Sequence, residues 1–172
     1  PVVGVAGPQG SGKTTLVMAH AASHLGVAHF SLDDVYLGAE ARRERAANVH
    51  PLFATRGPPG THDLDLYYAG LAALEAAAPA SRTQMPVFDK VADDRAPQSR
   101  WPIFEGRPRL ILVDGWCLGA LAQTSGALAA PVNQLEASED ELGEWRKQIN
   151  GQLRYAYSFA FAKLDAILYL RP

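Results

Sequence analysis

The residues with the clearest capacity for chemistry form the stretch "GPQGSGKTT", residues 7 to 15 of the 172-residue chain. Its first eight residues match G-x-x-x-x-G-K-[ST], in which the amides of a glycine-rich turn and the start of the next helix surround a phosphate. Lys13 is expected to reach the terminal phosphates of a nucleotide, and the Thr14 hydroxyl to ligate Mg²⁺. The predicted nucleotide-binding residues are Gly7, Gln9, Gly10, Ser11, Gly12, Lys13, Thr14 and Thr15.

A second group with chemical potential follows the apolar run "LILVD", residues 110 to 114, which is typical of a buried strand. Asp114 ends this run. In P-loop proteins an acidic residue at such a position helps to hold Mg²⁺, although an aspartate after a strand can also simply begin a turn. We predict a metal site that consists of Thr14 and Asp114.

The third group is "SLDDVY", residues 31 to 36, which follows another short apolar run. A kinase needs a carboxylate that takes the proton of the acceptor hydroxyl, and Asp33 and Asp34 are candidates for that catalytic role beside Lys13. The structural alternative is that one of them caps the next helix. The sequence lacks the N-K-x-D signature of guanine-binding switches, so the pattern favours a kinase over a signalling GTPase.

These groups require elements that bring them together. Residues 2–6, 27–31, 110–114 and 166–170 are expected to be strands, and "MPVFD", residues 85–89, a further short one. Helices are predicted for Lys13–Leu25, for Ala39–Asn48, and from Asp63 up to Pro79. Strands that alternate with helices indicate an α/β fold. We predict the three-layer α/β/α sandwich of P-loop NTPases, with a central parallel sheet that binds ligands beyond the carboxyl ends of its strands.

Two finer expectations concern helix ends and cores. Ser138 and Glu141 form an S-x-x-E pattern that predicts a capping box. The long helix behind it would place an apolar stripe in the core, formed by Leu142, Trp145, Ile149, Leu153 and Tyr157. In the first helix, Val17, Ala21 and Leu25 are predicted to share one face, with Gly26 as the stop.

Composition limits the class of protein. A hydrophobic fraction of 48%, a charged fraction of 20% and a net charge of -2 fit one ordinary globular domain. Basic residues are scattered, which argues against nucleic acid as a partner, and no apolar run reaches the length of about 20 residues that a membrane span needs. The single Cys117, expected to pack behind a strand, suits a reducing compartment, so we predict a cytoplasmic location. The oligomeric state is left open.

As a set, these stretches resemble the phosphoribulokinase and uridine kinase group of P-loop kinases, and within it the plant-type D-glycerate 3-kinases. The resemblance rests on "GPQGSGKTT", "SLDDVYL", "HPLFATRGPPGTHD", "PVFDKVADDRAP", "DGWCLG" and "VNQLEASED". It implies that Asp33, rather than Asp34, is the base. It also aligns Asp93 with a histidine of the uridine kinase motif, which argues against a nucleoside as the acceptor.

The resemblance implies an ATP- and Mg²⁺-dependent kinase that phosphorylates a small polyol acid, D-glycerate first among the candidates. The predicted acceptor-binding residues are Arg56, His62, Asp63, Asp89, Lys90 and Arg95. A nucleoside or pantothenate-type kinase and a non-catalytic nucleotide-dependent regulatory protein are the alternatives. Residues 1–172 are expected to form a single P-loop kinase domain that lacks the arginine-bearing lid and final helix of the family, so low turnover is expected.

Overall fold

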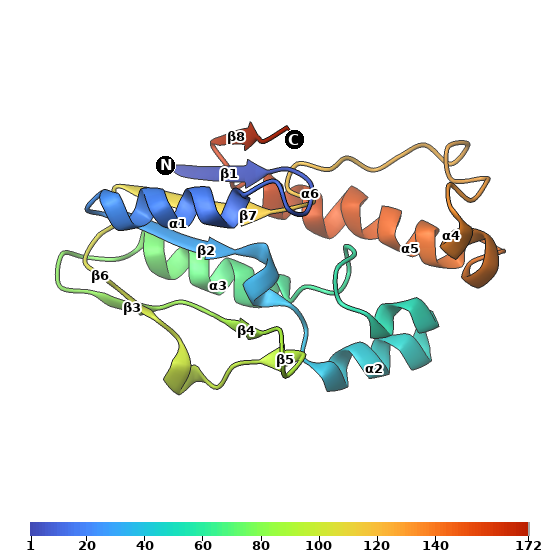
Figure 1. Cartoon of the computed structure of the whole chain (residues 1–172), viewed down its shortest axis with the longest axis horizontal. Coiled ribbons are helices and arrows are strands. Elements are labelled where there is room, and N and C mark those ends of the chain that lie inside the picture. The colour runs from blue at the N-terminus through green and yellow to red at the C-terminus, as the bar shows by residue number, and fades with distance from the viewer. Residues whose placement is uncertain (172) are drawn as a thin grey trace.

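The centre of the protein is a sheet of four parallel strands in the order β2-β7-β1-β8. The computed structural model describes residues 1–171. The strands are β1 (Val2–Ala6), β2 (Val27–Ser31), β7 (Leu110–Gly115) and β8 (Ala166–Tyr169) (Figure 1). All three strand pairs are parallel. The four predicted strands of the central sheet and their parallel arrangement are therefore confirmed.

Helices cover both faces of this sheet because its strands are apolar on both sides. On one face Leu112 and Val5 pack against Val17 of α1 (Lys13–Ser23). On the other face Ile111 and Val113 belong to the larger core, which includes α3 (Leu64–Glu75) and α6 (Ser158–Phe161). Successive residues of β7 thus alternate between two cores, as the pleat of a strand requires. The three-layer α/β/α arrangement is confirmed.

The remaining elements lie outside the central sheet (Figure 1). They are α2 (Ala39–Asn48), α4 (Gln134–Glu139), α5 (Glu144–Gln152), a π-helical turn (Leu153–Tyr157), and three short 3-10 helices at Leu32–Val35, Pro51–Ala54 and Gln98–Arg100. Two small antiparallel pairs join β3 (Arg82–Gln84) to β6 (Ile103–Glu105), and β4 (Phe88–Asp89) to β5 (Asp94–Arg95). Among the helices of residues 1–171, none combines the length and hydrophobicity needed to cross a membrane.

The predicted capping box at Ser138 and Glu141 is wrong. Ser138 lies inside α4, whose first turn is capped by Asn133 through the amide of Glu136 at 2.9 Å. The next helix starts only after Gly143, and the carboxylate of Asp140 accepts its first amides. Asp140 also pairs with the buried Arg146 at 3.0 Å. This carboxylate satisfies amides and a guanidinium together, so it outcompetes the local S-x-x-E signal.

Several predicted element ends are also wrong. Leu142 precedes α5 and is 75% exposed, and of the expected core stripe only Leu153 and Tyr157 belong to the main core. The long helix is divided by the π-helical turn. In α1 the helix stops at Ser23, and the extended backbone of His24 leaves Leu25 96% exposed. Of the predicted strand at residues 85–89, only Phe88–Asp89 pairs.

Candidate active site

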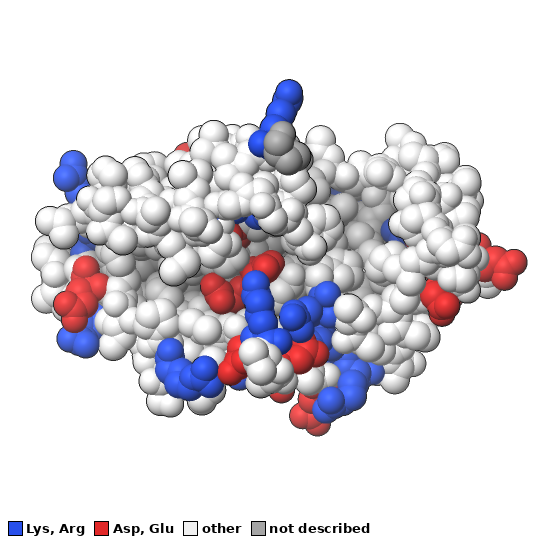
Figure 2. All heavy atoms as spheres, viewed as in Figure 1, with Lys and Arg blue, Asp and Glu red and all other residues white. Residues whose placement is uncertain are grey.

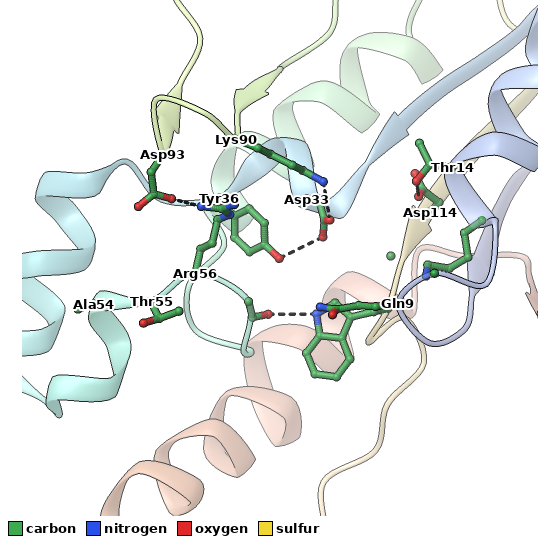
Figure 3. A pocket seen from close by; sticks show the side chains of 15 residues that line it. Gln9, Thr14, Asp33, Tyr36, Ala54, Thr55, Arg56, Lys90, Asp93 and Asp114 are labelled. Atoms are coloured by element: carbon green, nitrogen blue, oxygen red, sulfur yellow. Dashed lines mark hydrogen bonds and ion pairs between the residues drawn. The ribbon is translucent and has the colours of Figure 1, made fainter. Parts of the chain in front are cut away.

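A cleft of about 630 Å³ opens beyond the carboxyl ends of β1, β2 and β7, where the three predicted chemical groups meet. Figure 2 shows acidic and basic side chains that gather around a hollow near the middle of this face. Eight predicted site residues line the cleft: Gln9, Gly10, Lys13, Thr14, Asp33, Arg56, Lys90 and Asp114 (Figure 3). The fold thus brings residues from five separate stretches of the chain to one cavity.

The P-loop has the shape that a phosphate needs. Gly10 and Gly12 have φ angles of 76° and 82°. Residues other than glycine rarely adopt this left-handed backbone conformation. The Lys13 ammonium donates to the carbonyl of Pro8 at 2.8 Å, so it is held against the loop. The buried hydroxyl of Ser11 has no hydrogen-bond partner within residues 1–171. An orphaned donor in a glycine-rich turn fits a loop that surrounds phosphate oxygens.

Thr14 and Asp114, the two residues of the predicted metal site, are in direct contact. The Thr14 hydroxyl donates to Oδ2 of Asp114 at 2.6 Å, and His29 Nε2 lies 2.8 Å from the other carboxylate oxygen. Burial opposes ionisation of Asp114, but the hydrogen bonds from His29 and Thr14 outweigh it and hold the pKa of Asp114 below its usual range. A hydroxyl beside an ionised carboxylate suits Mg²⁺, which takes few protein ligands and completes its shell with water and phosphate. Residues 1–171 contain no cluster of three or more His, Cys, Asp or Glu side chains arranged for a metal.

The two adjacent aspartates have different environments. Asp33 lines the cleft, where Tyr36 donates its hydroxyl to Oδ1 at 3.1 Å and Lys90 donates to Oδ2 at 3.2 Å (Figure 3). Burial and the neighbouring Asp33 raise the pKa of the Tyr36 hydroxyl, which therefore stays a donor. Asp33 is thus the aspartate of the pair that an acceptor hydroxyl in the cleft can reach.

Asp34 does not line the cleft, and its carboxylate accepts hydrogen bonds from the backbone. Its carboxylate accepts from the amide of Ser31 at 3.2 Å, and the Ser31 hydroxyl accepts from the amide of Asp33, which completes a capping box. The second oxygen of Asp34 accepts from the amide of Phe88 at 3.4 Å. Burial raises the pKa of Asp34. The hydrogen bond between Asp34 and Phe88 connects the hairpin β4–β5 to the turn that carries Asp33.

The two cations predicted to bind the acceptor that line the cleft, Arg56 and Lys90, come from different loops. Arg56 pairs with Asp93, which also accepts from the guanidinium of Arg42 at 2.6 Å. Arg42 is only 1% exposed, and both guanidiniums lie 5.6 Å from the ring centroid of Phe88. Asp93 therefore joins a buried arginine to one at the rim of the cleft.

The remaining predicted site residues lie outside the cleft lining, and their proposed contact with an acceptor stays a prediction. Asp63 caps α3 through the amide of Leu66 at 2.9 Å and pairs with Arg95 at 2.5 Å; both border a separate recess. Asp89 accepts from the amides of residues 91 and 92 and from Arg100. Thr15 lies on α1 with an exposed side chain.

His62 is 5% exposed and supports the cleft wall from behind. Its Nδ1 lies 2.6 Å from the hydroxyl of Tyr157, and its ring stacks on Tyr36 with centroids 4.4 Å apart. The Tyr157 hydroxyl also accepts from the amide of Gly60 at 2.8 Å, so it joins His62 to the loop that precedes it. Burial lowers the pKa of His62 from 6.5 to about 3, against a smaller opposite effect of the Asp33 charge. The imidazole is neutral at physiological pH.

This burial predicts acid sensitivity. Below pH 6.5 the unfolded chain binds a proton at His62 that the folded chain refuses, so stability is complete above that pH and falls until about pH 3. The expected loss is about 1.4 kcal/mol per pH unit. In His62→Asn, which keeps an acceptor for Tyr157 and does not titrate, this component should vanish. Urea unfolding at pH 7 and pH 4.5 gives the change in the free energy of unfolding with pH. An equal change in the wild type and in His62→Asn would contradict the lowered pKa of His62.

Sequence reasoning missed three residues that shape the site. Tyr36 contacts Asp33, Trp116 lines the cleft and donates to the carbonyl of Gly57 at 3.1 Å, and His29 contacts Asp114. Tyr36 lies three residues after Asp33, so its place in "SLDDVY" was an available signal. No sequence pattern pointed to His29, because its partner lies 85 residues away.

Comparison with known proteins gives both sequence and structural relatives. The chain is 36% identical over 164 residues to the chloroplastic D-glycerate 3-kinase of Arabidopsis thaliana, and the match covers 87% of the chain and 36% of the relative. It is 33% identical over 131 residues to an uncharacterized kinase of Schizosaccharomyces pombe, with coverage of 69% and 46%. No protein-family model matches the chain.

The solved structure of a D-glycerate 3-kinase from Cryptococcus neoformans var. grubii superposes on the chain with a TM-score of 0.76 at 28% identity. That match covers 98% of the chain and 62% of the fungal protein. The chain thus spans less than half of each curated relative and less than two thirds of this solved one.

Proposed function

The chain is a relative of the D-glycerate 3-kinases within the P-loop kinases, and from this premise we propose that it transfers the γ-phosphoryl group of ATP to a hydroxyl of a small polyol acid, with D-glycerate as the leading acceptor. One observation carries the proposal: Asp33 shares its cleft with the P-loop residues Lys13 and Thr14 and with two cations from acceptor-side loops. A phosphate site alone would suit many proteins. A carboxylate and cations across from it suit a kinase whose acceptor is an acid.

Each residue has a role that follows from its position. Lys13 and the P-loop amides hold the phosphates, and Asp33 accepts the proton of the attacking hydroxyl. Arg56 offers a planar guanidinium, of which one nitrogen is engaged by Asp93, to the carboxylate of the acceptor. Asp34 keeps the turn of Asp33 in place, so in this proposal it supports catalysis without touching the acceptor.

The metal site follows from the same geometry. Thr14 and Asp114 are the residues that would hold Mg²⁺, directly or through water. When bound, Mg²⁺ neutralises charge on the transferring phosphoryl group. His29 fixes the orientation of Asp114, as partners behind metal ligands commonly do. A reducing, cytoplasmic environment remains part of the proposal, on the ground of the single buried Cys117, whose pKa burial raises to about 12.

The alternatives are a nucleoside or pantothenate-type kinase and a regulatory module that binds nucleotide without transferring phosphate. Asp93 speaks against a nucleoside, because its carboxylate is occupied by Arg42 and Arg56. The pairing of Lys90 with Asp33 speaks against the regulatory module, since a nucleotide switch has no need of acceptor-side cations in its cleft.

An ADP-release assay with D-glycerate, related sugar acids, nucleosides and pantothenate tests the proposal. We expect MgATP-dependent ADP release with D-glycerate, formation of a phosphoglycerate in equal amount, and loss of both after chelation of Mg²⁺. ADP release with a nucleoside and none with the acids would favour the nucleoside kinase. ATP binding without acceptor-dependent turnover would favour the regulatory module.

A further inference from the structure

The catalytic candidate Asp33 is engaged on both oxygens. Oδ1 accepts from Tyr36, which is 4% exposed and fixed by its stacking on His62. Oδ2 accepts from the ammonium of Lys90, whose side chain is 59% exposed (Figure 3). The two contacts therefore differ in mobility: one partner is locked in the core, and the other lies on a long flexible stem that can leave.

The backbone that carries Lys90 is held firmly. Lys90 is the first residue of the turn between β4 and β5. Before it, Asp89 accepts from two turn amides at 3.1 Å each and pairs with Arg100. After it, Asp93 has a positive φ of 53° and pairs with Arg42 and Arg56. Lys90 can therefore leave Asp33 by rotation of its own side chain alone, because the ammonium stands on a flexible four-carbon stem.

Each of the three cations that line the cleft already makes a contact within the protein. Three basic residues, Lys13, Arg56 and Lys90, face three acidic ones, Asp33, Asp93 and Asp114. Lys13 donates to Pro8, and Arg56 pairs with a carboxylate that also serves the buried Arg42. Lys90 has the most exposed contact of the three, and exposed ion pairs contribute little stability. An incoming carboxylate therefore detaches Lys90 most easily.

We propose that Lys90 guards Asp33 and is drawn away by the carboxylate of the acceptor, so that recognition of an acid acceptor and release of the base are a single event. This inference rests on the proposed kinase function and adds a specificity rule to it. Acceptors without a carboxylate, including water, leave Lys90 on Oδ2. Lys90 is thus a specificity-determining residue that suppresses wasteful ATP hydrolysis.

The same bonds form and break whether the acceptor is D-glycerate or water. The oxygen of the acceptor hydroxyl forms a bond to the γ-phosphorus, and the bond from the γ-phosphorus to the bridging oxygen of ADP breaks. The hydroxyl proton passes to Oδ2 of Asp33, the atom that Lys90 contacts when no acceptor is bound. With D-glycerate the product is a phosphoglycerate; with water it is inorganic phosphate. Occupation of Oδ2 by an ammonium hinders both reactions, and only an acid relieves the hindrance.

The test compares the wild type with Lys90→Gln, Lys90→Arg and the control Lys163→Gln, which removes the charge of an exposed lysine outside the cleft lining. ADP release is measured with MgATP alone, with D-glycerate and with glycerol, an uncharged triol. In Lys90→Gln we expect kcat/KM for D-glycerate to fall about tenfold, as one charge-assisted contact is lost. ADP release without acceptor should rise about three- to tenfold, and the rate with glycerol should rise relative to D-glycerate. Lys90→Arg should keep hydrolysis low, and Lys163→Gln should match the wild type.

The possible results distinguish a failure of the proposed role of Lys90 from a failure of the proposed kinase function. A rise in hydrolysis is a gain that a misfolded variant cannot produce, so it supports the inference directly. If Lys90→Gln loses glycerate transfer while hydrolysis stays the same or falls, Lys90 only binds the acceptor and the guard is overturned. If the wild type forms no phosphoglycerate at all, the proposed function fails, and the guard fails with it.

Discussion

Asp33→Asn is expected to reduce kcat for phosphoryl transfer to D-glycerate by about 10²–10⁴-fold, the contribution typical of a positioned general base. The asparagine carbonyl can still accept from Tyr36 or Lys90, so the local structure should persist. The amide cannot take the hydroxyl proton, and this is what the substitution removes. Rapid-quench measurement of phosphoglycerate formation gives kcat, and titration with a non-hydrolysable ATP analogue should give an unchanged Kd.

Asp34→Asn is the matched control, since it makes the same change at the neighbouring position. Asp34 accepts backbone amides of Ser31 and Phe88 and does not line the cleft. We expect this variant to lose thermal stability and to keep the kcat of its folded fraction near that of the wild type. An unaffected kcat in Asp33→Asn together with a large loss in Asp34→Asn would exchange the two roles.

Lys13→Met is expected to lower kcat/KM for ATP by about 10²–10³-fold, the cost typical of removing one preorganised donor from a transition-state charge. Lys13 is 9% exposed, and methionine preserves the packing of its stem while it removes the ammonium. The contact of Lys13 with the Pro8 carbonyl keeps the ammonium within the loop before nucleotide arrives. Steady-state kinetics at varied ATP and saturating D-glycerate measures the effect.

The control for this variant is Lys163→Met, which introduces the same side chain at an exposed lysine. Its kinetics should equal those of the wild type. Near-normal kcat/KM in Lys13→Met would show that the P-loop amides hold the phosphates without the lysine, and the assignment of Lys13 as the phosphate cation would then be wrong.

The parts of the fold that the sequence predicted correctly depend on local requirements. The glycines of the P-loop are needed where the backbone has positive φ, and the apolar runs around residues 2–6 and 110–114 are needed in a doubly covered sheet. Such constraints act within a few residues, so a motif carries them. The choice of Asp33 over Asp34 as the base came from resemblance and stays a prediction; of the two aspartates, Asp33 lines the cleft.

Predictions failed where a distant partner outcompeted a local signal. The S-x-x-E pattern at Ser138 gave way to Asp140, which serves two amides and the buried Arg146. Leu25 and Leu142 fit a helical period and are nevertheless exposed, because the helices end before or begin after them. Periodicity indicates which residues could share a face, but it does not show where capping groups stop the helix.

The sequence by itself determined that this protein has a nucleotide-type P-loop on a parallel α/β sheet with an aspartate pair beside it, since short-range geometry requires those residue types. Only the tertiary structure decided what each aspartate does. Packing places Asp34 against the backbone amides of Ser31 and Phe88 and leaves Asp33 between the buried Tyr36 and the exposed Lys90. The pairing of β2 with β7 brings His29 to Asp114. These contacts join residues 57 and 85 positions apart, and such distances are set by the folding of the whole chain.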